Sequence, residues 1–244
     1  VLRYKGNYKV KSFSCWHQML YMIFGQLSNR ESLSDLIVCL QSQKNKSYHL
    51  GMGRGTSKVN LAKANEKRDY RIYESFASSL VAQAQALSIP DESFELQIDA
   101  PVYAIDATVV DLCLNLFWWG KFRRHKAAVK LHTMLDVKTS IPTVIFITSG
   151  AVHEVNLLDH FPIEEGSYYL LDKGYIEFEK LYRIHKSAAY FVMPAKDNFA
   201  FVRLNSRTVD KQSGVICDQT VRLKNQLVSL KYPPELRRVK YRDA

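Results

Sequence analysis

The stretch Val102-Tyr103-Ala104-Ile105-Asp106-Ala107-Thr108 places an acidic residue inside an apolar, partly β-branched run, which predicts a buried strand. A second run, Tyr168-Tyr169-Leu170-Leu171-Asp172, also ends on an aspartate. A carboxylate in sequence this apolar is costly to desolvate unless a cation or hydrogen-bond donors compensate it. We therefore interpret Asp106 and Asp172 as candidate metal ligands. Alternatively, each aspartate caps a turn or pairs with a neighbouring lysine.

The two runs belong to a larger pattern of alternating strands and helices. We predict strands at 102–110, 130–136, 143–148, 168–171 and 190–193, with helices at 154–161 and 177–186. Helices that connect strands of one sheet are typical of an α/β fold with a mixed sheet. Beyond residue 197, short strands separated by turns predict a further antiparallel sheet.

The first part of the chain has helical spacing instead. Ser28 and Glu31 have the spacing of a capping box, which predicts a helix start at that point. A glycine-containing loop is expected at 44–56, and a longer connecting helix at about 70–87, before Pro90. This segment is interpreted as a separate helical domain.

The charge of the chain is uneven. Its 244 residues carry 34 Lys and Arg against 24 Asp and Glu, a net charge of +10. Residues 1–70 hold 12 basic and 4 acidic side chains, and residues 196–244 hold 11 and 5, whereas the middle is acidic. Basic flanks suit a polyanion such as nucleic acid, because each neutralised phosphate releases counterions. Solubility alone is the alternative explanation.

Two function classes are disfavoured by composition. No apolar run is long enough to span a bilayer, so no membrane partner is expected. The four cysteines are far apart and form no CxxC pair, which argues against a zinc cluster or a disulfide framework. Reduced thiols predict a cytoplasmic protein.

Basic residues at three places are candidate DNA contacts. The first group surrounds the start of a helix expected after Ser57, where backbone N–H groups attract phosphate and an asparagine can read adenine edges. The second follows Trp118 and Trp119, where rings and cations interleave, and the third is the lysine after Asp172. An exposed polar helix, a basic hairpin and a solvated turn are the respective alternatives. The candidates are Arg54, Lys58, Asn60, Lys63, Lys121, Arg123, Arg124, Lys126 and Lys173.

Several short motifs of this sequence, taken together in their order and spacing, resemble those of DDE transposases of bacterial insertion sequences, in the insertion sequence four group. The matching stretches are Tyr103–Thr108, Phe117–Arg123, Lys130–Thr133, Ile141–Thr143, Gly150–Asn156, Leu171–Tyr175 and Leu181–His185. The resemblance implies a ribonuclease H-like core with a β-rich insertion. It makes Asp106 and Asp172 the first and second catalytic acidic residues, which bind Mg²⁺ or Mn²⁺. The expected parts are a helical DNA-binding domain at 1–98, the catalytic core at 99–196 and the insertion at 197–244.

The resemblance also implies an activity. The family binds double-stranded DNA at element ends and at the target as a homodimer, and carries out metal-dependent strand cleavage and transfer. Its third acidic residue is a glutamate on a helix beyond the insertion. Glu235, the last glutamate here, follows Pro233-Pro234 in a predicted turn and is not assigned that role. We therefore expect a C-terminally truncated, inactive chain; the alternative is a non-catalytic DNA-binding protein derived from a transposase.

Overall fold

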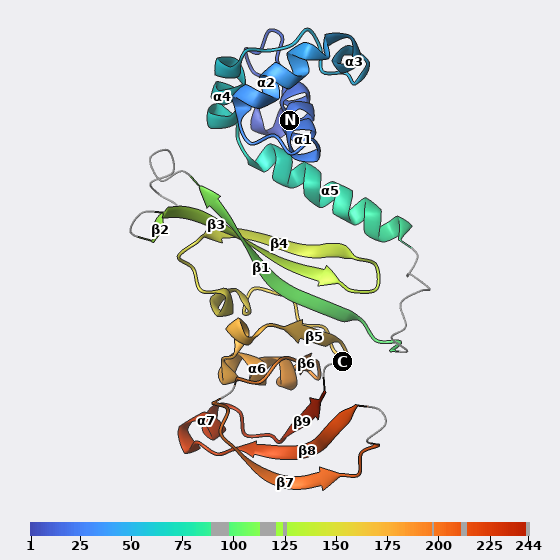
Figure 1. Cartoon of the computed structure of the whole chain (residues 1–244), viewed down its shortest axis with the longest axis vertical. Coiled ribbons are helices and arrows are strands. Elements are labelled where there is room, and N and C mark those ends of the chain that lie inside the picture. The colour runs from blue at the N-terminus through green and yellow to red at the C-terminus, as the bar shows by residue number, and fades with distance from the viewer. Residues whose placement is uncertain (89–97, 113–120, 124–125, 197, 211–213, 243–244) are drawn as a thin grey trace. The chain divides into compact units, whose positions relative to one another are not determined.

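The computed structural model describes residues 1–88, 98–112, 121–123, 126–196, 198–210 and 214–242. Two compact units make up the chain, Val1–Ala86 and Leu87–Ala244, and their elements are labelled in Figure 1. Across these described ranges, no helix combines the length and the apolar character needed to cross a membrane.

The first unit is entirely helical. Its elements are the 3-10 turn η1 (Leu2–Tyr4) and the helices α1 (Cys15–Leu27), α2 (Leu33–Ser42), α3 (Lys44–His49), α4 (Lys58–Lys67) and α5 (Arg71–Leu87). Three helices begin at capping serines: Ser14, Ser32 and Ser57 each accept the backbone N–H three residues later. The core that α1, α2 and α4 share contains Phe13, Tyr21, Leu36, Ile37, Leu40, Met52, Leu61 and Ala64.

Two expectations for this unit are wrong. Ser28 does not start the second helix but ends α1, where its hydroxyl donates to the Phe24 carbonyl at 2.6 Å. Asn29 then takes a left-handed backbone conformation (φ 52°), which ends the first helix and delays the next one to Leu33. The other error concerns residues 44–49, which form α3 rather than a loop. The connecting helix expected at 70–87 is confirmed as α5.

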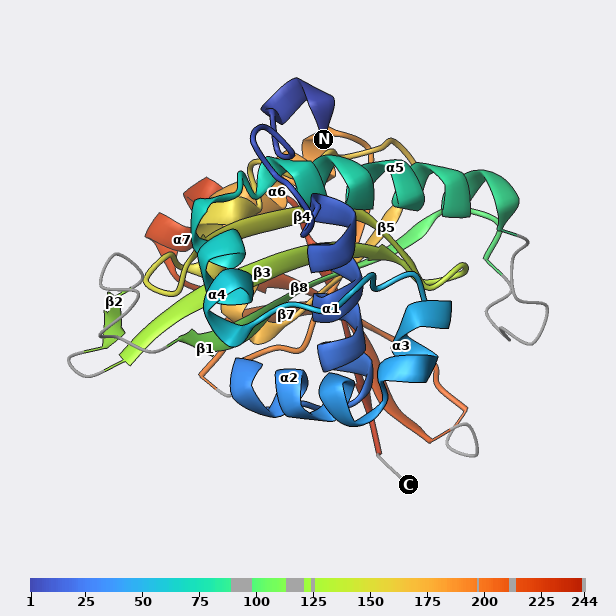
Figure 2. The same cartoon turned by 90° about the horizontal axis from the view of Figure 1, so that it is seen from above.

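The second unit contains a six-stranded mixed sheet. Its strands are β1 (Val102–Leu112), β2 (Lys121–Arg123), β3 (Lys126–Asp136), β4 (Ile141–Ser149), β5 (Tyr168–Leu171) and β6 (Tyr190–Val192). The order is β2-β3-β1-β5-β6, with β4 paired to β3. Strands β1, β3 and β4 pair antiparallel, whereas β5 and β6 run parallel to β1 (Figure 1). Figure 2 shows β3 between β1 and β4. The predicted α/β class with a mixed sheet is confirmed.

Short helical elements connect the parallel strands. They are η3 (Glu154–Leu157), η4 (Lys173–Tyr175) and α6 (Phe178–Lys186). Only the single 3-10 turn η3 forms where a helix was expected at 154–161. A residue before proline is disfavoured in the α conformation, and Pro162 closes this segment. Helix α6 buries Leu181 and Ile184 against the sheet, whereas His185 is exposed.

The end of the chain forms a second sheet, as expected. Strands β7 (Phe201–Arg207), β8 (Val215–Leu223) and β9 (Leu236–Tyr241) pair antiparallel in the order β7-β8-β9. Helix α7 (Gln226–Lys231) was not expected, although Asn225 caps it by accepting two backbone N–H groups. After α7, the ring of Tyr232 packs edge-on against Phe178 and Phe191, which joins this segment to the core of the larger sheet. Burial raises the pKa of Tyr232 to about 12.

Candidate active site

The two candidate aspartates follow paired residues of neighbouring parallel strands. Ile105 in β1 is in register with Leu171 in β5, and the next residue of each strand is an aspartate. Parallel register therefore carries Asp106 and Asp172 to the same level of the sheet. Both are exposed, and within the described ranges neither carboxylate is held by a hydrogen bond or an ion pair. Two adjacent, uncompensated negative charges favour a cation between them.

Alternation along β1 accounts for the accessibility of Asp106. Tyr103 and Ile105 point into the core, with exposed fractions of 9% and 2%. Because successive side chains of a strand point to opposite faces, Asp106 lies on the other face, together with Ala104 and Thr108. The strand is fixed by its buried residues, and it presents the carboxylate to solvent.

A third carboxylate, which the sequence analysis did not single out, lies beside Asp172. Glu154 begins η3 and reaches the turn at Gly174: a Cβ at residue 174 would lie 2.7 Å from Glu154 Oε2 and 3.9 Å from Asp172 Oδ2. Both carboxylates therefore face the bare Cα of this glycine. Lys130 Nζ, on β3, donates to Glu154 Oε1 at 3.1 Å and to the Val152 carbonyl at 3.1 Å. Glu154 is thus held in place from the sheet.

A buried tyrosine lies in the short turn that Asp172 begins. Tyr175 is fully buried in the core, and its hydroxyl has no hydrogen-bond partner among the described residues. Burial raises the pKa of this hydroxyl, and the negative charges of Glu154, Asp106 and Asp172 raise it further, in that order. The phenol is therefore neutral at physiological pH. Its O–H remains available as a hydrogen-bond donor.

His132 lies on β3 close to the same ion pair. Its Nε2 is 2.9 Å from Thr148 Oγ1, and its buried Nδ1 has no partner in the described part of the chain. Burial lowers the pKa of His132, the positive charge of Lys130 acts in the same direction, and Glu154 opposes both. His132 is therefore neutral near pH 7.

The oxygen donors at this place suit a hard cation. Carboxylates and water are the ligands that Mg²⁺ prefers, and Asp106 and Asp172 are both open to solvent. Across the described residues, however, no set of three His, Cys, Asp or Glu side chains is close enough to hold a metal ion by itself. The residues present fit an ion that two aspartates bind and that keeps several waters.

The helical group of DNA-binding candidates lies at one end of α4. Arg54 precedes the helix, and Lys58, Asn60 and Lys63 lie on it; all four are exposed. The amide of Asn60 donates to Thr56 Oγ1 at 2.8 Å, so this side chain is engaged within its own turn. Helix α4 buries only Leu61 and Ala64, which leaves a polar, basic outer face.

The remaining candidates lie in the second unit. Strand β2, which contains Lys121 and Arg123, pairs with the start of β3 at Lys126, as in the basic hairpin that was the alternative to a DNA contact. Arg124 lies outside the described residues, as do Trp118 and Trp119, and the positions of the other hairpin side chains are not among those described. Lys173 is exposed in η4, directly after Asp172.

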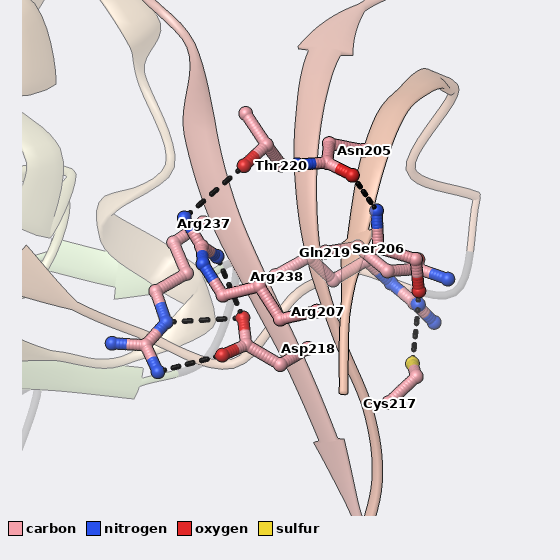
Figure 3. A network of polar contacts seen from close by, with 9 residues as sticks. All are labelled: Asn205, Ser206, Arg207, Cys217, Asp218, Gln219, Thr220, Arg237 and Arg238. Carbon is pink, nitrogen blue, oxygen red and sulfur yellow. Dashed lines mark hydrogen bonds and ion pairs between the residues drawn. The ribbon is translucent and has the colours of Figure 1, made fainter. Parts of the chain in front are cut away.

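The small sheet carries an arginine cluster that the sequence analysis missed (Figure 3). Asp218 on β8 accepts hydrogen bonds from Arg207 Nη1 at 2.9 Å and from Arg237 Nη2 at 2.7 Å. Hydrogen bonds from Arg237 and then Arg207 lower the pKa of Asp218. Arg238 donates separately to Gln219 Oε1 at 3.0 Å. One aspartate shared by two arginines ties the three strands together and leaves an excess of positive charge.

Comparison with known proteins identifies the family. Residues 97–242 match the family described as "Transposase DDE domain", and residues 1–53 match a "Domain of unknown function (DUF4372)". The chain is 28% identical over 188 residues to "Putative transposase y4zB" of Sinorhizobium fredii (strain NBRC 101917 / NGR234), which covers 75% of this chain and 51% of that protein. It is 26% identical over 128 residues to "Probable transposase for insertion sequence element IS5377" of Geobacillus stearothermophilus, covering 50% of this chain and 34% of that protein.

The chain therefore spans about half the length of the first relative and about a third of the second. The family match covers more than half of this chain, including both strands that lead to the paired aspartates. The order of strands in the large sheet agrees with a ribonuclease H-like core of mixed α/β architecture. The chain belongs to the transposase DDE domain family.

Proposed function

We propose that this chain carries the end-binding region and the first two catalytic carboxylates of an insertion-sequence transposase that cleaves and joins DNA strands. The observation that carries the proposal is the parallel register of β1 and β5, in which Ile105 and Leu171 pair and each is followed by an aspartate. A family match that spans the same segment supports the assignment.

In this proposal Asp106 and Asp172 hold Mg²⁺ or Mn²⁺. When bound, such ions stabilise the charge that develops on the attacking and leaving oxygens during phosphoryl transfer. The buried face of β1 fixes the position of Asp106, and the 3-10 turn that follows Asp172 fixes its backbone, because the Asp172 carbonyl accepts the Tyr175 N–H at 3.0 Å. Lys173, exposed beside Asp172, is placed to contact a phosphate of the cleaved strand.

DNA is the proposed partner of both units, with a homodimer acting on paired ends. The exposed basic face of α4 suits the phosphate backbone of element ends, because Lys58 begins the helix, Lys63 lies one to two turns further along it and Arg54 precedes it, all exposed. The hairpin at 121–127 is the proposed contact in the second unit. The proposed domain limits remain 1–98, 99–196 and 197–244.

Cleavage of element-end DNA by the gene product tests this function. With Mg²⁺ present, Asp106→Asn and Asp172→Asn should each abolish strand cleavage, whereas DNA binding in EDTA should be unchanged. Cleavage at the wild-type rate by either variant would refute the assignment. The alternative is a DNA-binding protein without catalysis, derived from a transposase. It predicts binding without nicking under every metal condition.

A further inference from the structure

We propose that Glu154 and Tyr175 form an outer shell for the cation at Asp106 and Asp172, binding the waters of the ion rather than the ion itself. The inference rests on the proposed function, because it requires a cation at the two aspartates. It assigns positioning roles to two residues outside that pair.

Glu154 is held in one orientation beside Asp172. Its Oε2 approaches the bare Cα of Gly174 from one side, and Asp172 Oδ2 lies near the same point. The other oxygen, Oε1, is engaged by Lys130, whose side chain is only 10% exposed. Lys130 is itself tied to the Val152 carbonyl, so the carboxylate has a fixed orientation. Glu154 therefore presents one oriented oxygen toward Asp172.

The three acidic side chains, Glu154, Asp106 and Asp172, are not close enough together to bind one ion directly. They do not form a set that could hold a metal ion directly within the described part of the chain. A cation at Asp106 and Asp172 would accordingly leave Glu154 beyond its first coordination sphere. Mg²⁺ and Mn²⁺ of such sites keep several waters, and these waters are strong donors toward a nearby carboxylate. Such indirect partners orient the ligands of a metal and raise its affinity.

The hydroxyl of Tyr175 is buried without a hydrogen-bond partner among the described residues. A fully buried tyrosine normally bonds its O–H to protein or water, because an unsatisfied buried polar group is costly. Here the O–H is without a partner among the described residues, and Tyr175 belongs to the short turn that Asp172 begins, in which its backbone N–H donates to the Asp172 carbonyl at 3.0 Å. A water of a bound cation, donating to the phenolic oxygen, would give this buried group a partner. This orphaned group, independent of the acidic cluster, indicates a polar ligand at this place.

Mn²⁺ binding to the purified chain, followed by the electron paramagnetic resonance signal of the free ion, tests the inference. Glu154→Gln should weaken Mn²⁺ affinity about tenfold to a hundredfold, the range typical of outer partners. Tyr175→Phe, which keeps the ring in the core, should weaken it severalfold. Glu179→Gln on α6 and Tyr190→Phe on β6 are the matched controls, since both residues are exposed. They should bind Mn²⁺ as the wild type does.

The outcomes separate this inference from the proposed function. If the wild-type chain binds no Mn²⁺, or if Asp106→Asn binds it normally, the metal assignment fails and this inference fails with it. If Asp106→Asn loses binding while Glu154→Gln and Tyr175→Phe retain wild-type affinity, only the outer shell is overturned. Unfolding temperatures in EDTA distinguish a loss of affinity from a loss of structure. Should Glu154→Gln not fold, Tyr175→Phe alone decides.

Discussion

Replacing Gly174 with alanine tests how tightly Glu154 is held against the aspartate turn. The new Cβ would lie 2.7 Å from Glu154 Oε2, whereas ordinary contact begins at 3.4 Å, so the carboxylate must retreat by about 0.7 Å. A free glutamate would move at little cost. Here Lys130 holds the carboxylate at 3.1 Å and is itself fixed to a backbone carbonyl, so the retreat strains a charged hydrogen bond.

The magnitude follows from two opposing contributions. Losing a hydrogen bond to a charged group costs roughly 1.5–3 kcal/mol. Alanine reduces the conformational freedom of the unfolded chain, which returns about 0.4–1 kcal/mol. We therefore expect Gly174→Ala to lower the free energy of unfolding of the second unit by about 1–2 kcal/mol.

Urea denaturation of a double-mutant cycle isolates this contact. In a Glu154→Ala background, the nearest atom to the new Cβ is Asp172 Oδ2 at 3.9 Å, an ordinary contact. Gly174→Ala should then be neutral or slightly stabilising, because only the effect on the unfolded chain remains. An equal cost in both backgrounds would show that Glu154 does not crowd Gly174, and the geometry of the site would need revision.

Three further results are expected. In urea denaturation with EDTA present, Tyr175→Phe should leave the free energy of unfolding unchanged or raise it by up to about 1 kcal/mol, because it removes an unpartnered buried hydroxyl. A marked loss of stability would mean that the hydroxyl has a protein partner. The two arginines that bind Asp218 hold its pKa below the usual 3.8, so this carboxyl stabilises the fold above that value and the stabilisation is lost as the pH falls through the folded-state pKa. The free energy of unfolding of Asp218→Asn, measured as a function of pH, should lack this loss of stability in acid. A pH profile identical to that of the wild type would show that ionised Asp218 does not stabilise the fold. Finally, Lys58→Ala and Lys63→Ala should each reduce the slope of log affinity against log salt for element-end DNA by about one, as measured by fluorescence anisotropy; an unchanged slope would remove α4 from the DNA interface.

The central sheet could be predicted from sequence because its signals are local. The apolar runs that end at Asp106 and Asp172 are strands in the structure, and their parallel pairing brings the following aspartates to one level. The strands are predictable because a sequence displays their two-residue period directly. The sequence analysis treated Asp106 as a carboxylate that is costly to desolvate, whereas in the structure it lies on an exposed face of β1.

Other elements depended on contacts that a local pattern does not contain. Helix α7 is short and leaves Leu227 and Leu230 exposed, so the Asn225 cap was its only local signal in the sequence. The approach of Glu154 to Gly174 joins residues from separate connections, and the Lys130 that holds it comes from a third element. A lysine within a strand reads as a surface residue, whereas here it is buried because it pairs with a carboxylate and a carbonyl.

Iron-directed cleavage of the polypeptide tests most directly whether the two aspartates share one cation. Fe²⁺ substituted for Mg²⁺, with ascorbate and peroxide, generates radicals that cut the backbone near the bound ion, and mass spectrometry locates the cuts. The account predicts cuts beside both Asp106 and Asp172 in the wild-type chain, and the loss of both sets in Asp106→Asn as well as in Asp172→Asn. Cuts at only one of these segments, or cuts at one aspartate that persist when the other is replaced, would contradict a shared site.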